Sequence, residues 1–318
     1  MARFCLVLVV GLVMSAVLTS VEIPFLKKKQ FKQYIREEGP ESHQKKSGTP
    51  TMGGIAMIAS QVLVMLILGD SGFETLMMIC MMLMFGAIGF FDDFIKVAKK
   101  HNLGLRAWQK IVLQVAFAAV LAVYISNFSD YGTKVFIPFI GEYIEFGVMY
   151  IPFVILVVVA MANSVNLTDG LDGLCSGVTA IVSVLFAIIA FKMGQNPPFV
   201  FCAALSGVCL GFLIFNRHPA KLFMGDTGSM ALGGGLAAAA IMLKMEFLLV
   251  IAGFVYVLES LSVIIQVASF KTRGKRVFKM APIHHHFEMS GMSEQSVVHM
   301  FWIISAVCSI IAYFVYKI

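Results

Sequence analysis

Long apolar stretches alternate with short polar segments along the chain. A membrane-spanning helix needs about 20 predominantly apolar residues. Windows of this kind lie at residues 3–21, 52–69, 73–91, 110–126, 148–165, 174–193, 198–215, 229–245, 247–268 and 297–316. No internal repeat or low-complexity segment divides the chain. The pattern therefore predicts one domain, residues 1–318, of all-α fold: a polytopic integral membrane protein with about ten transmembrane helices.

The composition excludes the other broad classes of protein. Hydrophobic residues make up 59% of the 318 positions and charged residues 13%, and the mean hydropathy is +0.88. A soluble domain is about 45–50% apolar and about 25% charged, and a disordered chain is more polar still. The six cysteines are scattered through apolar stretches without a C-x-x-C pair. We therefore expect neither a disulfide framework nor a thiolate metal site.

Basic residues gather on one side of the predicted bundle. Of the 24 Lys and Arg residues, 19 fall in the segments 22–51, 92–110, 166–173, 216–228 and 269–296. An excess of Lys and Arg marks cytoplasmic loops, so we expect these segments inside and both termini on the outer face. The lysines at 27–29 follow the first window, which is typical of a retained helix and not of a cleaved signal. Topology thus explains the net charge of +6, and no nucleic-acid partner is expected.

The longest predicted outer segment is residues 127–147. It contains Gly132, Pro138 and Gly141 among aromatic and β-branched residues, which favours a short hairpin lying on the membrane. Nothing in this segment suggests chemistry.

Acidic residues stand where topology does not require them. Five of the seven aspartates lie in the predicted cytoplasmic segments near the ends of spans: Asp92, Asp93, Asp169, Asp172 and Asp226. If the third helix continues past the interface, Lys96 shares a face with the first two of them. An intrahelical ion pair explains one aspartate but not its neighbour, whose repulsion favours a bound cation such as Mg²⁺. Solvated helix ends are the alternative for any single aspartate.

Two further polar clusters follow along the chain. In the first, polar residues recur every three positions and glycines permit tight turns: Asn163, Asn166, Asp169, Gly170, Asp172 and Gly173. An array of Asx turns and caps is the structural alternative. In the second, Asp226 stands between glycines before the eighth window, as a helix cap or as a metal ligand beside N–H groups for a phosphate. No phosphate-binding P-loop motif is present.

Histidines and one intramembrane acid complete the candidate chemistry. His284, His285 and His286 are consecutive, so a regular helix directs them apart by about 100° each and they do not all ligate one metal. We expect these histidines to form hydrogen bonds to sugar or phosphate oxygens, with one or two of the three having only a structural role. Glu259 lies mid-span in the ninth window. It is a functional candidate by default, and pairing with another helix is the structural alternative.

At these positions the sequence closely resembles the bacterial phospho-N-acetylmuramoyl-pentapeptide transferases, a branch of the polyprenyl-phosphate N-acetylhexosamine-1-phosphate transferase superfamily. The resemblance covers nearly the whole chain and rests on SHQKKSGTPTMGG (42–54), FDDFIK (91–96), NSVNLTDGLDGL (163–174), NRHPAKLFMGDTGS (216–229) and APIHHHFE (281–288). The aspartate motifs resemble those of the whole superfamily, whereas GTPTMGG and PIHHHFE are more specific to this branch.

The resemblance implies a ten-helix transferase, usually a homodimer, in the bacterial cytoplasmic membrane with its active site on the cytoplasmic face. It implies transfer of phospho-N-acetylmuramoyl-pentapeptide from its UDP carrier, UDP-N-acetylmuramoyl-pentapeptide, to undecaprenyl phosphate. The products are lipid I and UMP, in the first membrane step of peptidoglycan synthesis, and Mg²⁺ is the implied cofactor.

The resemblance also implies roles for individual residues. Asp92 resembles the catalytic aspartate, Asp93 its neighbour in the metal–phosphate site and Asp226 the Mg²⁺ ligand, so all three are expected at the metal. The implied substrate contacts are Lys46, Thr51, Asn166 and Asp169, then Gly170, Leu171 and Asp172 in a uracil pocket with Phe223 stacking on the base, and His284, His285 and His286 near the sugar and phosphates.

The implied transfer could follow either of two mechanisms, and two other functions are alternatives to it. Asp92 either attacks the donor phosphate covalently or positions the lipid phosphate for direct attack. A phosphomonoester has a second pKa of about 6, so little proton remains to be removed at pH 7, and direct attack is favoured. A sister transferase using UDP-N-acetylglucosamine is the nearest alternative, and PIHHHFE argues against it. The other alternative is a secondary transporter with Glu259 as its ion-coupled site. Transporter sites lie near the bilayer midplane, whereas nearly all the unexplained polar residues here lie at the predicted cytoplasmic ends of spans.

Overall fold

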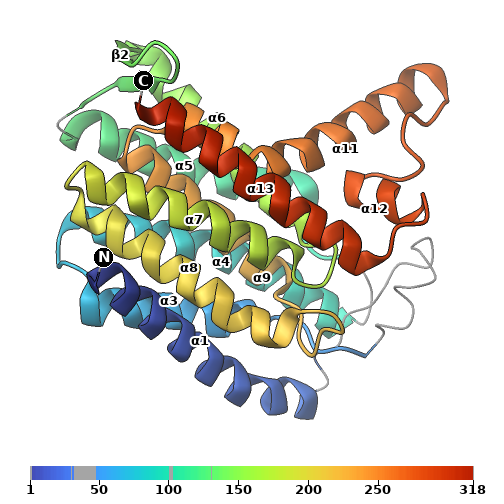
Figure 1. Ribbon diagram of the computed structural model, residues 1–318. Helices are drawn as coiled ribbons and strands as arrows, with labels where there is room; N and C mark the ends of the chain where they lie inside the picture. Colours follow the sequence, from blue (N-terminus) through green and yellow to red (C-terminus); the bar gives the residue numbers. More distant parts are fainter. Residues whose placement is uncertain (1, 30, 32–47, 100–102, 130, 318) are drawn as a thin grey trace.

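The computed structural model describes residues 2–29, 31, 48–99, 103–129 and 131–317, and Figure 1 shows it as a bundle of helices. The helices are α1 (Ala2–Lys28), α3 (Gly54–Leu68), α4 (Phe73–Lys99), α5 (Ala107–Phe128), α6 (Tyr150–Thr168), α7 (Leu174–Lys192), α8 (Asn196–Asn216), α9 (Gly225–Met242), α10 (Glu246–Ala252), α11 (Phe254–Arg273), α12 (Ile283–Glu288) and α13 (Glu294–Lys317). A short sheet, β1 (Lys134–Ile137) with β2 (Glu142–Glu145), and the 3₁₀ helix η1 (Gly147–Met149) lie between α5 and α6.

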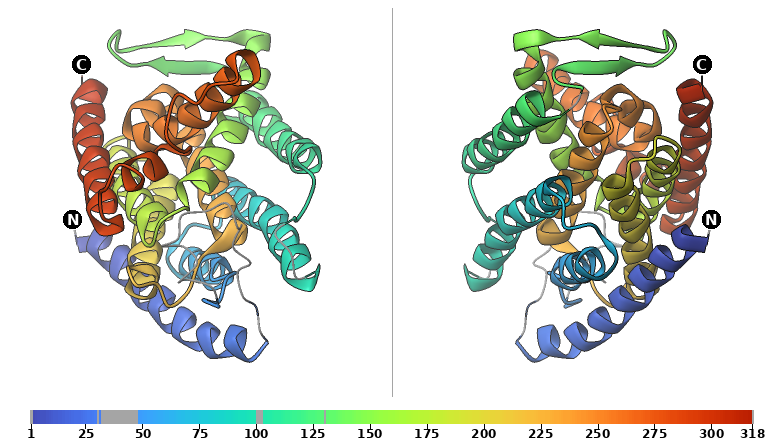
Figure 2. Two further views of the ribbon diagram at one scale, coloured as in Figure 1. Left: turned by 90° about the vertical axis from the view of Figure 1, so that its right-hand side faces the viewer. Right: turned by 90° about the vertical axis from the view of Figure 1, so that its left-hand side faces the viewer.

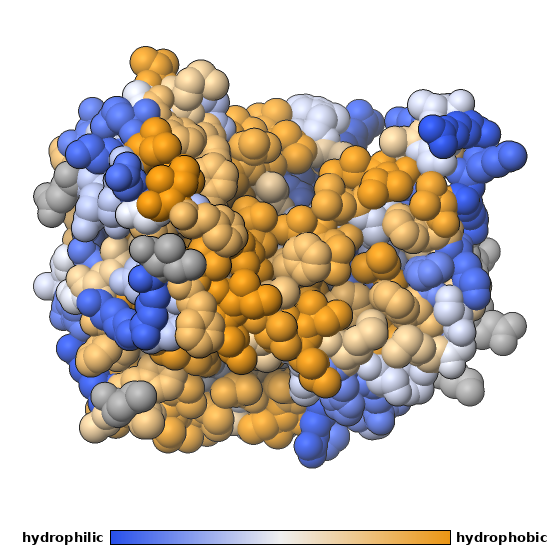
Figure 3. All heavy atoms as spheres, turned by 45° about the horizontal axis from the view of Figure 1, so that its top comes forward, coloured by the Kyte–Doolittle hydropathy of each residue, from blue (hydrophilic) through white to orange (hydrophobic). Residues whose placement is uncertain are grey.

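The helices coincide with the apolar windows of the sequence. Within the described part of the chain, eight are long and apolar enough to cross a membrane, namely α1, α4, α5, α6 (counted together with η1), α7, α8, α11 and α13. The second and eighth windows correspond to the 15-residue α3 and the 18-residue α9. The face drawn in Figure 3 is apolar across its middle, with hydrophilic residues towards both ends. The all-α polytopic fold is confirmed; the count of ten spans and the side of the termini stay predictions.

The ninth window differs from the sequence prediction. A single helix was expected over 247–268, but α10 ends and α11 begins at Gly253. The Gly253 N–H bonds to the Leu249 carbonyl at 2.8 Å, and α11 then projects outward from the bundle (Figure 1). A Cβ at residue 253 would lie 2.7 Å from that carbonyl oxygen, so the close approach needs glycine. The prediction of one continuous helix was wrong because a lone glycine in an apolar run is a weak signal for a break.

Helix α9 is the centre of the bundle and carries few large side chains. Its glycines at 233 and 234 let the backbone of α6 and the ring of Phe85 on α4 approach closely, since a Cβ at either position would lie 2.6 Å from them. Where α3 crosses α9, Gly54 packs directly against the backbone of Gly228. Small residues allow such close helix packing inside a membrane, where van der Waals contact is a main source of association. The packing fixes the N-terminus of α9 between α3 and α4.

Residues 134–145, in the segment predicted to lie outside, form the hairpin that the sequence predicts. Strands β1 and β2 pair antiparallel, with Lys134 opposite Glu145, and both termini lie at the same end of the bundle as this hairpin, opposite α12 (Figures 1 and 2). The hairpin is tied to the helices by the buried Lys244. The Lys244 ammonium donates to the Gly132 carbonyl (2.6 Å) and to the Tyr150 hydroxyl (2.8 Å). Glu246, also fully buried, faces the same hydroxyl at 3.5 Å.

Lys244→Met should destabilise the protein by about 1–3 kcal/mol, because it removes the donor to the Gly132 carbonyl and the Tyr150 hydroxyl and leaves the buried Glu246 carboxyl without its basic neighbour. Thermal unfolding in detergent measures the loss. The exposed Lys192, at the C-terminal end of α7, provides the matched control Lys192→Met. The double variant Lys244→Met/Glu246→Gln should recover part of the stability. Unfolding of Lys244→Met at the same temperature as Lys192→Met would contradict this account.

Candidate active site

Three aspartates from two helices meet at the end of the bundle away from the hairpin. Asp92 and Asp93 lie near the C-terminal end of α4, and Asp226 is the second residue of α9. One carboxylate oxygen from each lies within 4.8 Å of the other two. Asp92 and Asp93 are buried, and the Asp226 side chain is 18% exposed. We call these three residues the acidic centre. The structure therefore brings together the three aspartates that the sequence analysis assigned to one site.

Asp93 is held by the N-terminus of α9. Its carboxylate accepts hydrogen bonds from the Thr227 N–H (2.9 Å), the Thr227 hydroxyl (2.7 Å) and the Asp226 N–H (3.2 Å). The first N–H groups of a helix lack partners within the helix, and an acid there also interacts favourably with the helix dipole. Gly225 has φ +70°, and a Cβ on it would lie 2.5 Å from Asp93 Oδ2. Asp93, and not Asp226, is thus the residue that caps α9.

Asp226 instead turns its carboxylate towards cations. Its Oδ2 lies 3.1 Å from the Lys96 ammonium and 2.9 Å from the Lys110 ammonium, and its Oδ1 accepts from the Asn166 amide at 2.9 Å. The sequence left open whether Asp226 caps the N-terminus of α9. The structure does not support that role, because the residue at the N-cap position is Met224 and makes no side-chain hydrogen bond there.

Asp92 shares the same two lysines. Its carboxylate lies 2.6 Å from Lys96 and 2.9 Å from Lys110, and it accepts a hydrogen bond from the Leu105 N–H at 2.8 Å. The acidic centre thus interleaves three carboxylates with two ammonium groups. Carboxylates grouped in this way can ligate a divalent cation, and ammonium groups beside them can pair with an anion such as a phosphate.

The polar residues that recur every three positions from Asn163 have different partners in the structure. Asn166 bonds Asp226 and Ser229, each at 2.9 Å, and so belongs to the acidic centre. Asn163 instead donates to the Gln114 side chain at 2.8 Å and joins α6 to α5. Asp169 follows the end of α6. Burial raises its pKa well above the usual range, and the nearby carboxylates of Asp226 and Asp93 raise it further.

Two segments far apart in the sequence lie beside each other next to the centre. The Phe223 N–H donates to the Pro50 carbonyl, and the Gly53 N–H donates to the Phe223 carbonyl, each at 2.9 Å. These bonds place the GTPTMGG segment along the loop before α9. The buried Thr51 lies at Gly225, where a Cβ would meet its hydroxyl at 3.0 Å. Lys46, predicted as a substrate contact, lies outside the described residues.

The three histidines occupy the short helix α12, and each has a different partner. His284 is buried, and its Nδ1 lies 3.0 Å from Glu259 Oε2. His285 pairs with Glu288 at 2.8 Å, and His286 Nδ1 accepts from the Lys279 N–H at 3.2 Å. The His284 ring packs against Gly170, where a Cβ would collide with it. Glu259 thus makes the kind of pairing that the structural alternative expects, because it joins α11 to α12, and its functional role stays a prediction.

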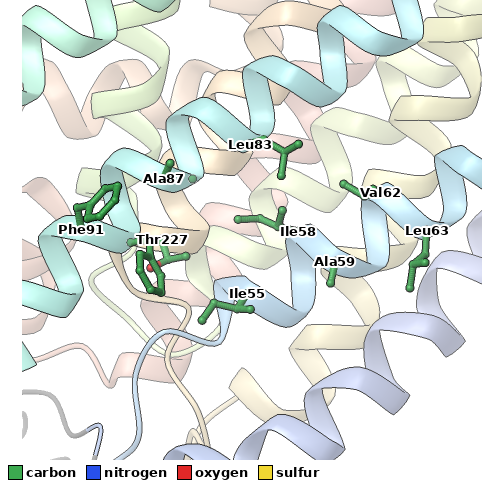
Figure 4. A pocket seen from close by; sticks show the side chains of 11 residues that line it. Ile55, Ile58, Ala59, Val62, Leu63, Leu83, Ala87, Phe91 and Thr227 are labelled. Carbon is green, nitrogen blue, oxygen red and sulfur yellow. The ribbon is translucent and has the colours of Figure 1, made fainter.

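An apolar groove leads up to the acidic centre along α3 and α4. Figure 4 shows its walls, which include Ile58 and Val62 from α3 and Leu83 and Phe91 from α4. Thr227, the residue that donates to Asp93, lies at one end of the groove. Apolar surface and a charged centre are thus directly adjacent.

Gly89→Ala should disrupt the acidic centre without changing any of its residues. Gly89 on α4 packs against the Asp226 carbonyl, and a Cβ there would collide with that backbone, so α9 must shift away from Asp93. We expect a loss of about 1–3 kcal/mol in stability and at least a tenfold loss of activity, since small displacements of catalytic groups are costly. Gly72→Ala is the matched control, because open space surrounds Gly72. Equal activity of the two variants would refute the close-packing argument.

Some of the residues that complete the site were not predicted from the sequence. Lys110 was counted only as a topological charge, although it contacts both Asp92 and Asp226. Glu294 and His218 were not singled out, and they hold Asp172. Lys110 is the first residue of the apolar window 110–126. A lysine at the start of an apolar window was the only available signal that it belongs to the site.

The fold and the site together define a polytopic membrane protein with a buried acidic and basic centre of the kind that handles phosphates. The profile of Glycosyl transferase family 4 matches residues 75–244, and the phospho-N-acetylmuramoyl-pentapeptide-transferase signature 1 matches residues 46–58. These two matches include the acidic centre and the GTPTMGG segment.

Curated relatives named phospho-N-acetylmuramoyl-pentapeptide-transferase match almost the full chain. The protein from Clostridium botulinum (strain Alaska E43 / Type E3) is 50% identical over 307 residues, which are 96% of this chain and 94% of the relative. The protein from Halalkalibacterium halodurans is 50% identical over 311 residues (96% and 95%). The protein from Thermoanaerobacter sp. (strain X514) is 46% identical over 312 residues (98% of each). The chain therefore belongs to the phospho-N-acetylmuramoyl-pentapeptide-transferase family.

Proposed function

We propose that the chain transfers phospho-N-acetylmuramoyl-pentapeptide from UDP-N-acetylmuramoyl-pentapeptide to undecaprenyl phosphate, releasing UMP and forming lipid I. The observation that carries the proposal is the acidic centre with Lys96 and Lys110 among its carboxylates. Joining two anionic phosphates requires positive charge at the point of reaction, and this is the largest contribution to phosphoryl transfer in general. The names and near-complete coverage of the relatives support the same reaction.

The acidic centre fits a Mg²⁺ ion. Mg²⁺ binds through one or two carboxylates together with substrate phosphates, and the donors here are carboxylate oxygens of Asp92, Asp93 and Asp226. A bound Mg²⁺ would neutralise charge on the phosphates. Asp226 is best placed as the principal ligand, because Asp93 is already engaged by the N-terminus of α9. With the carboxylates bound to Mg²⁺, Lys96 and Lys110 would be free to pair with the phosphates.

The donor is proposed to lie across the loops that surround the centre. Thr51, Asn166 and Asp169 line the side towards the phosphates, together with Lys46. Gly170, Leu171, Asp172 and Phe223 belong to the uracil pocket, and His285 and His286 face the sugar. His284, which is buried against Gly170 and Glu259, supports this wall and does not present its Nδ1 to a ligand.

The acceptor is proposed to attack directly. At pH 7 the lipid monophosphate is largely dianionic, since its second pKa is about 6, so Asp92 orients it more than it deprotonates it. The site is proposed to face the cytoplasm of a bacterial inner membrane, and the chain to act as a homodimer. The opposite placement of hairpin and α12 (Figure 1) supports a site and termini on different membrane faces.

Release of UMP from radiolabelled donor tests the function. The purified protein is incubated with undecaprenyl phosphate and donor, with Mg²⁺ or with EDTA. We expect UMP only when donor, lipid and Mg²⁺ are all present. Labelled phosphosugar trapped on the protein without lipid would overturn direct attack, and turnover of UDP-N-acetylglucosamine in place of the muramoyl donor would identify the sister transferase.

A further inference from the structure

A closed ring of polar contacts joins α13 to two loops beside the acidic centre. Asp172 Oδ2 accepts from the Ala220 N–H at 3.0 Å and lies 3.2 Å from His218 Nδ1. Glu294 Oε2 lies 3.3 Å from the same imidazole nitrogen. Glu294 Oε1 accepts from the Asp172 N–H at 2.9 Å. We call Asp172, His218 and Glu294 the loop ring.

The ring is largely shielded from water. The side chains of Asp172 and Glu294 are 2% and 9% exposed, and that of His218 is 38% exposed. Two buried carboxylates repel one another unless a donor lies between them, and His218 Nδ1 stands in that position. The three groups and the Ala220 N–H therefore satisfy one another, and the cluster needs no ion to explain it.

The two loops in the ring lead directly into the acidic centre. The loop 169–173 begins at Asp169, whose N–H donates to the Asn166 carbonyl at 3.3 Å, and the Asn166 side chain in turn bonds Asp226. The loop 217–224 continues into Gly225 and Asp226 at the start of α9. A second bridge reinforces the pair, because Asn216 accepts from the Gly173 N–H (3.1 Å) and donates to the Leu222 carbonyl (3.0 Å). The distance between the loops is thus set by side chains that do not belong to the acidic centre.

We propose that Glu294 is a positioning residue that holds these two loops at the separation required by the nucleotide half of the donor. The inference rests on the proposed function, because the same loops carry Leu171 and Phe223 of the proposed base pocket. In the described part of the chain, the Glu294 carboxylate bonds the Asp172 N–H and pairs with His218, which are both on the loops and outside the acidic centre. It therefore governs affinity for the nucleotide more than the chemical step.

The experiment compares Glu294→Ala, Glu294→Gln and the control Gln295→Ala, whose side chain is exposed one residue further along α13. The Kd of UMP is measured by calorimetry, and steady-state assays give KM for donor, KM for lipid and kcat. Glu294→Ala opens both ring contacts and should raise the Kd of UMP and the donor KM about tenfold. Its kcat at saturating donor and its lipid KM should stay within about twofold. Glu294→Gln keeps the acceptor for the Asp172 N–H and should fall between Glu294→Ala and the unchanged protein.

The outcomes separate the two proposals. If the unchanged protein does not bind UMP, the proposed function fails. If it binds UMP and Glu294→Ala binds equally well, the positioning role fails. A uniform loss of kcat and thermal stability with an unchanged Kd for UMP would also overturn it, because that pattern belongs to a purely structural contact.

Discussion

Asp226→Asn is expected to abolish turnover, with a loss in kcat of about 10³-fold or more, while the Kd of UMP changes by less than about threefold. The asparagine has the same shape and keeps an oxygen for the Asn166 amide, which donates to Oδ1 at 2.9 Å. It removes the negative charge that faces Lys96 and Lys110. Removing one preorganised electrostatic group from an active site typically costs 10²–10³-fold, and loss of a metal ligand adds to this.

Activity and UMP binding are measured together with metal binding, so that a folding defect is recognised. The control is Glu142→Gln, which removes one exposed carboxylate on the hairpin far from the centre. We expect Mg²⁺ to raise the melting temperature of the unchanged protein and of Glu142→Gln, as a ligand of the folded state does. It should not raise that of Asp226→Asn. Robust Mg²⁺-dependent activity in Asp226→Asn would refute its role as a ligand.

The positions of the acidic residues were predictable because the membrane makes polar residues conspicuous. Topology requires Lys and Arg at the inner ends of spans but not aspartate, so Asp92, Asp93 and Asp226 stood out. Their convergence follows from the fold, because the inner ends of all spans share one membrane face. The hairpin at 134–145 was predictable because Pro138 and Gly141 interrupt a segment of aromatic and β-branched residues.

The partners of these residues were not predictable. Asp93 caps a helix 133 positions away, and Lys110 reaches Asp226 across 116 positions. Such contacts depend on how α4, α5 and α9 pack, whereas periodicity reports only which face of one helix is apolar. His284 illustrates the same limit. The sequence did not reveal that its Nδ1 lies 3.0 Å from Glu259 on α11 or that its ring packs against Gly170.

Lys110→Met is expected to have two opposite effects, which makes it a sharp test of the charge arrangement in the centre. The Lys110 ammonium lies 2.9 Å from both Asp92 and Asp226 and competes with any cation for them. With three carboxylates and one remaining lysine, the centre should bind Mg²⁺ about tenfold more tightly. Turnover should nevertheless fall about 10²-fold, because a cation that stabilises the reacting phosphates is lost.

The two effects are measured separately, and the first does not depend on activity. The Mg²⁺ concentration that produces half of the rise in melting temperature reports metal affinity, and kcat/KM for donor reports catalysis. Lys99→Met is the control, because Lys99 is an exposed lysine on α4 about two turns beyond Asp92 and Asp93. Tighter Mg²⁺ binding together with a lower kcat/KM would mean that Lys110 competes with the metal for the carboxylates and also stabilises the reacting phosphates. Weaker Mg²⁺ binding in Lys110→Met would instead mean that the lysine holds the carboxylates together. The proposal that Lys110 leaves the carboxylates for the phosphates when Mg²⁺ binds would then be wrong.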